Sequence, residues 1–378
     1  MTTPPLVALD IGSTKVACAV ALPHERSPGF ELLGSSLVSY PSLSEAWLGD
    51  PLMVGRAVEQ ALEATAVQGD FHRALVAINH PALMSEQVQV AVALGDEPVT
   101  VRAQDLDRLQ ASALDRALGV DREPLLVERL GCVGNGFNGV RDPRGLSATR
   151  LLGTFHIVTM PMAARRALVQ AVESAGLEVA RLTYSLPAAL ASLADEEILQ
   201  KRAMLIDVGG LATDVGLFTE GVLAVLDTVP WGGLRLATAI AKNLQVTMEQ
   251  AITWSLEGAA CRKPEVRALI EEQRKPLHQA IGRILKDQPR PDLVLLAGRG
   301  ALIDGFAEWV ERITGASTVL CRSPRTSRLG DLARQVGLST AIGLLEIATR
   351  ASNGAVSRSP RFLNRLIDRT RLILTEYF

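Results

Sequence analysis

Two stretches of the chain share one pattern of hydrophobic and polar positions. Each is a short apolar run that reaches an aspartate and a glycine, LVALDIG at 6–12 and MLIDVGG at 204–210, and each continues into a second strand-like run, at 14–22 and at 213–221. This alternation predicts two β-hairpins with tight glycine turns, and a third strand, VLAVLDTV, follows the second hairpin. Asp10 and Asp207 lie 197 positions apart. The repeat predicts two related α/β halves in one chain.

The segment between the hairpins has a different pattern of hydrophobic and polar residues. Its pattern predicts strands over 73–94 and a helix with acids in its first turn over 100–118. It further predicts strands around a Gly-rich hairpin over 122–160 and a helix over 161–179. We therefore expect a small inserted α+β domain over 72–159. After the second hairpin, Gly232 and Gly233 open a helical pattern, and the buried strand DLVLLA ends at Gly298 and Gly300 before a helix over 301–315.

The last eighteen residues form an amphipathic pattern on a helical wheel. One arc carries the apolar side chains Phe362, Leu363, Leu366, Ile367, Ile373, Leu374, Tyr377 and Phe378. The opposite side carries Arg361, Arg365, Arg369 and Arg371. A Ser/Gly/Pro-containing linker over 351–360 precedes this helix. Either the helix packs on its own domain, or its apolar face enters a lipid surface.

Composition narrows the class of protein. The chain has 378 residues, of which 48% are hydrophobic and 21% charged, so it is long enough for several packed subdomains and is not a disordered protein. Its net charge of −2 gives no reason to expect nucleic acid as a partner. The four cysteines contain no CxxC pair, and no apolar run approaches the roughly 18 residues of a spanning helix. Because Asp10 interrupts the N-terminal apolar run, we expect no signal peptide and a cytoplasmic chain.

The three strand ends marked by glycines are the candidate ligand-binding site. The first turn offers backbone amides, hydroxyls and an ammonium group, which suit phosphate oxygens, and its carboxylate suits Mg²⁺ held through water. The second turn would hold the same phosphates from the other half, and the third would approach a base or a ribose. The candidate nucleotide-binding residues are Asp10, Gly12, Ser13, Thr14, Lys15, Asp207, Gly209, Gly210, Thr213, Asp214, Gly232, Gly233, Gly298 and Gly300, with Asp10 and Asp207 as the Mg²⁺ sites. The alternative for each turn alone is a tight hairpin without a ligand.

Taken in order, these motifs resemble the actin-like ATPase superfamily. The insertion between the hairpins narrows the resemblance, because NGVRDPRGLSATRLLGTFHIVTMPMAARRALVQAVESAGLEV is similar to the corresponding element of the FtsA family. VPWGGLRLATAIAKNL also resembles the FtsA segment after the second hairpin, and the arginine-rich tail resembles the FtsA membrane-targeting helix. The similarity covers residues from about 5 to 350, and the combination is more specific than any one motif.

The resemblance implies an α/β, actin-like fold of two related halves around a nucleotide cleft, with an inserted α+β domain and a C-terminal amphipathic helix. The implied subdomains are 1A (1–71, 160–202 and 336–350), 1C (72–159), 2A (203–234 and 291–335) and 2B (235–290). The resemblance further implies that the protein binds ATP with Mg²⁺, polymerises, and tethers FtsZ to the cytoplasmic face of the cell membrane at the division site. The C-terminal peptide of FtsZ would bind within 235–290, anionic lipid would bind 361–378, and other division proteins are open as partners.

The chain departs from the family at residues that matter for hydrolysis. Leu211 replaces the third glycine of the second turn, and Arg299 interrupts the late glycines. Ser185 and Leu186 stand where the superfamily often has a carboxylate or carboxamide that faces the attacking water, so slow or absent hydrolysis is expected. Gln250 and Thr253 replace a family Glu–Lys pair near the sugar.

Two other functions are alternatives to the FtsA-like function. One is a PilM-like adaptor of type IV pilus assembly, which shares the fold and insertion and binds an inner-membrane partner, but lacks such a terminal helix. The other is a small-molecule kinase of the same superfamily, which would need a catalytic carboxylate in the cleft and would have no reason for a membrane tail.

Overall fold

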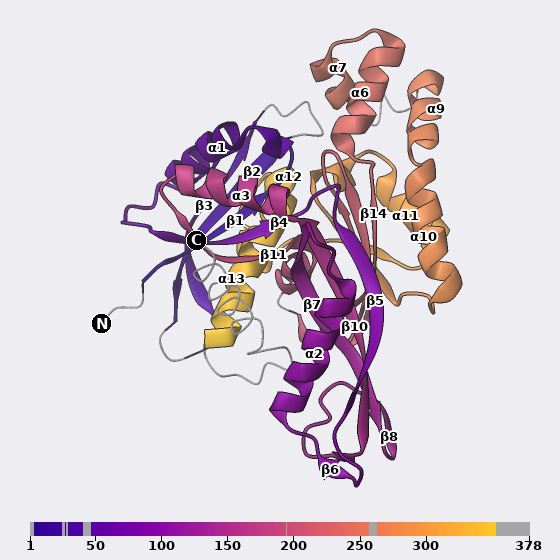
Figure 1. Ribbon diagram of the computed structural model, residues 1–378. Coiled ribbons are helices and arrows are strands. Elements are labelled where there is room, and N and C mark those ends of the chain that lie inside the picture. Colours follow the sequence, from indigo (N-terminus) through magenta and orange to yellow (C-terminus); the bar gives the residue numbers. More distant parts are fainter. Residues whose placement is uncertain are drawn as a thin grey trace.

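The computed structural model describes residues 4–24, 27, 29–40, 47–193, 195–256 and 263–352 of the chain. Two five-stranded sheets lie side by side, an inserted domain extends from the base of the first, and a group of helices projects beyond the second (Figure 1). The predicted amphipathic helix 361–378 and the linker from residue 353 onward lie outside the described residues.

The first sheet has the strand order β11-β4-β1-β2-β3. Its strands are β1 (Leu6–Ile11), β2 (Lys15–Pro23), β3 (Phe30–Ser39), β4 (Arg73–Ile78) and β11 (Glu178–Tyr184). The hairpin predicted at 6–22 is present as the antiparallel pair β1–β2, while β1 and β4 pair in parallel.

The second sheet repeats this arrangement in the order β14-β13-β12-β15-β16. Its strands are β12 (Arg202–Val208), β13 (Thr213–Thr219), β14 (Val222–Val229), β15 (Leu293–Ala297) and β16 (Thr318–Leu320). Again an antiparallel hairpin, β12–β13, is followed by a parallel partner, β15. The internal repeat predicted from the two hairpins is therefore confirmed.

The alternation of residue size along the strands explains the layers of the first half. On β1 and β2, Val7, Leu9 and Val16 belong to the core that contains α1 (Pro51–Glu63) and α3 (Met162–Ser174). The intervening positions, such as Ala8 and Ala17, face α13 (Ser339–Ser352) on the other side. Because both faces are buried, the run reads as continuously apolar, as expected for a strand covered on both faces.

The inserted domain has its own sheet in the order β5-β10-β7-β8. Its elements are β5 (Met84–Ala93), α2 (Ala103–Ala117), β7 (Arg122–Gly134), β8 (Phe137–Val140) and β10 (Arg150–Pro161), with a small pair of β6 (Val99–Thr100) and β9 (Ser147–Ala148) at its tip. Helix α2 packs on this sheet through Leu106, Leu109 and Ala113 in a separate core. The predicted inserted α+β domain is thus present (Figure 1).

One boundary differs from the sequence-based expectation. The run 73–94 was expected as paired strands inside an insertion that begins at residue 72, but β4 pairs with β1 and β11 in the first sheet. The inserted sheet begins only at Met84, with β5 paired to β10. The apolar pattern predicts both strands, but it does not predict which strand each one pairs with.

The second half carries most of the remaining helices. Helices α6 (Gly233–Leu244), α7 (Met248–Leu256), α9 (Pro264–Gln273) and α10 (Lys275–Asp287) lie between β14 and β15 in the chain, and α6, α7 and α9 form the projecting group in Figure 1. The helix expected over 301–315 is instead a 3₁₀ turn, η2 (Arg299–Leu302), followed by α11 (Phe306–Thr314). The break falls at Gly305, whose φ of 69° is left-handed and does not continue a helix.

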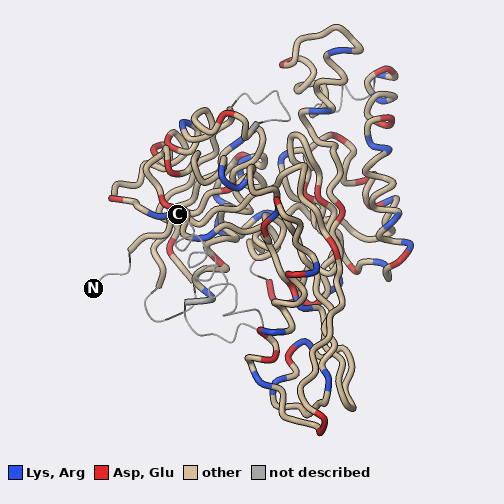
Figure 2. Tube along the Cα trace, in the orientation of Figure 1, with Lys and Arg blue, Asp and Glu red and all other residues tan. Residues whose placement is uncertain are grey.

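The connecting elements complete the two halves. Short helices α4 (Ser185–Ala191) and α5 (Glu196–Gln200) link the first half to the second, and α12 (Leu332–Gly337) leads back into α13. Two further 3₁₀ turns are η1 (Trp47–Gly49) and η3 (Pro324–Thr326). Lys and Arg are interspersed with Asp and Glu along the trace, consistent with the small net charge (Figure 2).

Candidate functional site

The first glycine turn joins β1 to β2 and is held at both ends. The Gly12 amide donates to the Lys15 carbonyl at 2.9 Å, which closes the turn. Tyr40 supports it from outside, since its hydroxyl donates to the Gly12 carbonyl and its amide donates to the Thr14 carbonyl. The amides of Ser13 and Thr14 donate to no acceptor within the described part of the chain. Successive free amides in a turn form a concave binding place for an anion.

The second glycine turn joins β12 to β13 and is backed by a helix. The Gly209 amide donates to the Ala212 carbonyl at 3.0 Å. The amides of Gly233 and Leu234, in the first turn of α6, donate to the carbonyls of Gly209 and Gly210, each at 2.9 Å. An added Cβ at Gly232 would lie 2.5 Å from the Gly209 carbonyl oxygen, so glycine there permits close packing of helix and turn. Two of the helix's N-terminal amides are thereby satisfied by the turn itself.

The first and second turns touch each other across the boundary between the halves. A Cβ added to Gly210 would lie 2.6 Å from Thr14 Cγ2 and 3.0 Å from Ser13 Oγ. The third turn meets the second from the other side, because a Cβ on Gly298 would lie 2.4 Å from the Val208 carbonyl oxygen. Gly300 packs equally closely on the Val208 side chain. The three turns predicted as separate motifs therefore converge at the end of β12.

Charged side chains gather at the same place. The Lys15 ammonium pairs with the Asp10 carboxylate and donates to the Gly337 carbonyl at 2.9 Å. Burial raises the pKa of Asp207 to about 6, and repulsion from Asp10 adds to the rise, while Lys15 and Ser185 oppose it. Asp10 and Asp207 are thus close enough to influence each other, and a cation between them would relieve that repulsion.

Thr213 and Asp214 are buried on opposite faces of β13: Thr213 lies on the side of Trp231, and Asp214 lies on the side of Tyr184 from the first half. The Thr213 hydroxyl donates to the Trp231 carbonyl at 2.8 Å, and Thr228 donates to the Asp214 carboxylate at 2.7 Å. Burial raises the pKa of Asp214 to about 7, although the neighbouring Tyr184 and the Thr228 hydroxyl oppose the rise. Both candidates are fully buried beneath the second turn, so their direct role here is to fix its strands.

The residues that depart from the family pattern have other contacts in this structure. Arg299 reaches from the third turn into the first half, where its guanidinium donates to Ser39 Oγ at 3.2 Å. Gln250 forms a capping box with Thr247 at the start of α7: the amide of each residue donates to the side chain of the other at 3.1 Å. Ser185 and Leu186, both fully buried, begin α4. The Leu186 side chain packs against Gly216 in the second sheet.

Several supporting residues could not be identified from the sequence. Tyr40, Ser39 and Gly337 contact the turns from positions far along the chain, and no local motif marks them. Their only signal would have been the expectation that a buried turn needs partners for its carbonyls.

The donor set fits a phosphate-bearing ligand better than a bare metal ion. Within the described ranges no group of three or more His, Cys, Asp or Glu side chains could hold a metal. The two neighbouring carboxylates would leave most positions around a Mg²⁺ ion to water and phosphate oxygens, which is how Mg²⁺ usually binds. The unsatisfied amides of Ser13 and Thr14 would supply the complementary contacts to an anion. No helix among the described residues is long and apolar enough to cross a membrane.

Comparison with solved structures finds the same fold. A chain of a PilM–PilN type IV pilus biogenesis complex matches with a TM-score of 0.67 at 15% identity, covering 91% of this chain and 98% of that one. The ethanolamine utilization protein EutJ from Carboxydothermus hydrogenoformans matches with a TM-score of 0.53 at 15% identity, over 92% of this chain and 90% of that one. MreB5 of Spiroplasma citri bound to ADP matches with a TM-score of 0.50 at 11% identity, over 94% of this chain and all of that one. At such low identities these matches establish the fold alone.

Comparison of sequences is more specific. A family profile described as the SHS2 domain inserted in FTSA matches residues 81–159, which form the inserted domain. The cell division protein FtsA of Pseudomonas aeruginosa is 26% identical over 94% of this chain and 91% of its own length. FtsA of Rhizobium meliloti is 27% identical over 92% of this chain and 84% of its own length. FtsA of Escherichia coli is 20% identical over 90% of this chain and 89% of its own length. The chain therefore resembles FtsA cell-division proteins over most of its length, and its first half carries an insertion that matches their inserted domain.

Proposed function

We propose that the chain binds ATP with Mg²⁺ between its two halves. The observation that carries this is the contact of two glycine turns, one from each half, beside free amides and a pair of carboxylates. Ser13, Thr14 and Gly210 would donate backbone hydrogen bonds to phosphate oxygens, and Lys15 would neutralise their charge. Asp10 and Asp207 would hold Mg²⁺ through water. The similar fold of MreB5, which was solved with ADP, supports a nucleotide as the ligand.

Rapid hydrolysis is not part of this proposal. The Ser185 and Leu186 side chains, which stand where a water-orienting group would be expected, are buried in the core. Neither side chain offers a carboxylate or carboxamide to position an attacking water, and loss of such a group costs on the order of 10²–10⁴ in rate. We propose a protein that uses nucleotide mainly as a bound ligand.

Calorimetry with Mg–ATP tests the site. Asp10→Ala together with Asp207→Ala should weaken Mg–ATP binding at least tenfold, because both proposed Mg²⁺ contacts are lost. Asp227→Ala is the matched control, since that carboxylate lies on β14 and pairs with Arg283. Unchanged affinity in the double variant would remove the nucleotide from this cleft.

We further propose that the protein polymerises on the inner face of the cell membrane and tethers FtsZ there. The relatives are cell division proteins, and the arginine-flanked apolar arc of 361–378 has the pattern of an interfacial helix. Each arginine near anionic lipid contributes about 1 kcal/mol. One such helix binds reversibly, and a filament that presents many would bind firmly through avidity.

Sedimentation with anionic liposomes tests the tail. The full chain should pellet with vesicles that contain phosphatidylglycerol and should carry purified FtsZ with it. A chain that ends at residue 360 should stay in the supernatant while still binding FtsZ. Equal pelleting of both chains would rule out the tail as the membrane anchor.

A basic pocket is the candidate contact for the FtsZ peptide. It measures about 250 Å³ and is lined by residues of α9, α10 and α11 and by Arg274 between α9 and α10: Glu271, Arg274, Lys275, His278, Trp309 and Arg312. The excess of cationic side chains and the half-buried Trp309 ring suit an acidic peptide with an apolar residue. Most of the pocket falls within 235–290, where the family resemblance expects the peptide.

Fluorescence anisotropy with a labelled FtsZ C-terminal peptide tests this pocket. Lys275→Ala with Arg312→Ala should weaken binding about tenfold or more, whereas Lys242→Ala on α6 should not. If the double variant binds as well as the parent chain, the peptide binds elsewhere. If the parent chain binds no FtsZ peptide but binds the cytoplasmic tail of a pilus inner-membrane protein, the PilM-like alternative, whose fold is shared, takes its place.

A further inference from the structure

The inserted domain is attached to the second half as well as to the first. Besides its covalent links to the first half, it lies against β14 through β5, β7 and β10. Three of its side chains bond to one short segment, residues 220–224, which forms the β13–β14 turn and the start of β14. The two halves are therefore connected at the glycine turns and again through the insert.

The first bond is made by Arg141, which follows β8. Its guanidinium pairs with the Glu220 carboxylate and also reaches the Glu220 carbonyl at 3.4 Å. Glu220 and Gly221 both have positive φ, 50° and 73°, as in the two-residue turns that match the twist of a hairpin. Arg141 is itself positioned by Arg129, whose side chain donates to the Arg141 carbonyl at 2.6 Å.

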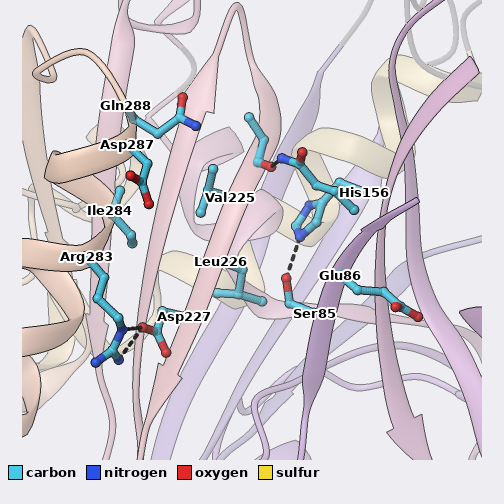
Figure 3. A pocket seen from close by; sticks show the side chains of 12 residues that line it. Ser85, Glu86, His156, Val225, Leu226, Asp227, Arg283, Ile284, Asp287 and Gln288 are labelled. Carbon is cyan, nitrogen blue, oxygen red and sulfur yellow. Dashed lines mark hydrogen bonds and ion pairs between the residues drawn. The ribbon is translucent and has the colours of Figure 1, made fainter. Parts of the chain in front are cut away.

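The other two bonds come from the inserted sheet. His156 Nδ1 bonds to the Leu223 carbonyl at 2.9 Å, and Gln87 donates to the Ala224 carbonyl at 2.7 Å. His156 and Gln87 are directly opposite in the β10–β5 pairing, so they act from one face. A carbonyl can only accept, so His156 Nδ1 carries the proton and Nε2 accepts from the Ser85 hydroxyl at 2.6 Å (Figure 3).

The boundary between the insert and β14, called the seam below, is only partly filled next to these bonds. A pocket of about 330 Å³ lies between Ser85, Glu86, Gln87 and His156 of the insert and residues of β14 and α10 (Figure 3). Beside this pocket, Leu126 and Val158 of the insert belong to the same buried apolar cluster as Leu223 and Leu226 of β14, so polar bonds and apolar packing together hold the insert against β14.

One strand connects this seam to the glycine turns. Strand β13 has seven residues, Thr213–Thr219, and spans about 23 Å at 3.3 Å per residue. At its start it leaves the second glycine turn, and at its end it enters Glu220. It is held on both sides, by β12 and β14, so a displacement at one end is carried to the other.

We propose that residues 220–224 and the insert form a clamp that couples occupancy of the glycine turns to the position of the inserted domain. A ligand that moves the second turn would move β13, and β13 would alter the bonds of Arg141, His156 and Gln87. This inference rests on the proposed nucleotide site and adds to it a route by which nucleotide changes the surface of the insert.

Hydrogen exchange of the full chain, followed by mass spectrometry, tests the clamp without ligand. Arg141→Ala with Gln87→Ala should speed amide exchange in 220–226 by about tenfold, because two bonds that restrain the turn are lost. Arg144→Ala is the matched control, since Arg144 pairs with Asp142 inside the insert. Equal exchange in the double variant and the control would show that no clamp exists.

Exchange with saturating Mg–ATP tests the coupling. In the parent chain, binding should change exchange in 85–89 and 220–226, and the double variant should bind ATP with the change in 85–89 lost. Unchanged exchange in 85–89 when calorimetry reports bound ATP would overturn the coupling while leaving the nucleotide site intact. Absence of any ATP binding would overturn the nucleotide site and the coupling together, and the ligand-free comparison would still decide whether the clamp holds.

Discussion

Burial sets the charge of individual residues in this chain. His156 is 1% exposed, and burial lowers its pKa to about 4, although the bond to Leu223 opposes the change. It is therefore neutral at pH 7, which lets it bridge Ser85 and Leu223 as one donor and one acceptor. Asp207 and Asp214 show the reverse effect, because burial raises the pKa of a carboxyl.

Acid should weaken the fold through His156. Its pKa is about 6.5 in the unfolded chain and about 4 in the folded one, so the unfolded chain binds more protons between these values. Stability is thus fully present above pH 6.5 and is lost as pH falls to 4, by about 3 kcal/mol if no other group responds. Urea unfolding at pH 7 and pH 4 should show a smaller loss for His156→Gln than for the parent chain. Equal losses in the two chains would contradict this assignment.

The glycines of the turns should separate ligand binding from folding. A Cβ at Gly12 would meet nothing closer than 3.6 Å, whereas one at Gly210 would collide with Thr14 and Ser13. Gly12→Ala should keep the melting temperature within about 2 °C and still weaken ATP binding, because Gly12 belongs to the turn proposed to hold the phosphates. Gly210→Ala should lower the melting temperature by several degrees. The reverse order of the two melting temperatures would show that the turns are packed differently.

At the scale of elements, patterns of burial and capping decide where helices form. Helix α10 has its buried side chains Leu277, Ala280, Ile281 and Ile284 on one face and begins with Pro276 in its first turn. Gly282 interrupts the exposed face, and a Cβ added there meets nothing within 4 Å. The glycine therefore costs helix stability without serving a visible contact.

Gly282→Ala should stabilise the protein. Alanine is preferred over glycine in a helix interior by about 0.8–1.0 kcal/mol, and no neighbour obstructs the new methyl group. Thermal or denaturant unfolding should show an increase of about that size. ATP and FtsZ-peptide binding should stay as in the parent chain, and a decrease in stability would mean that Gly282 has a packing role.

At the scale of the whole molecule, one core joins the halves. The largest apolar cluster combines Leu9, Val16 and Val172 of the first half with Leu205 and Leu223 of the second. Leu186 of α4 and Leu223 of β14 both pack against Gly216, where an added Cβ would lie 2.5 and 2.8 Å from their side chains. Loss of this contact affects both halves at once.

Leu223→Ala should therefore destabilise the two halves together. Removal of a fully buried leucine costs about 2–5 kcal/mol, and the cavity would lie where the halves meet. Three of the four tryptophans, Trp231, Trp254 and Trp309, lie in the second half, so their emission reports on it, while circular dichroism reports on the whole chain. Both signals should shift to lower urea by the same amount. Separate transitions would show that the halves unfold independently.

The elements and their repetition follow from local patterns in the amino-acid sequence. The strands β1, β2, β12 and β13 follow from apolar runs that end at Asp and Gly, and the insertion follows from a change of pattern between them. These features are local, because strand and turn preferences depend on neighbouring residues. The amphipathic pattern of 361–378 is equally local, and it stays a prediction.

Which of these elements meet depends on packing over the whole fold. Several contacts join positions far apart in the chain. Strand β4 pairs within the first sheet, Gly210 contacts Ser13 and Thr14, and Tyr40 supports the first turn. The insert forms hydrogen bonds to residues 220–224. Sequence periodicity tells a strand which face to bury but not which strand to pair with, because pairing is settled by the packing of whole layers against each other.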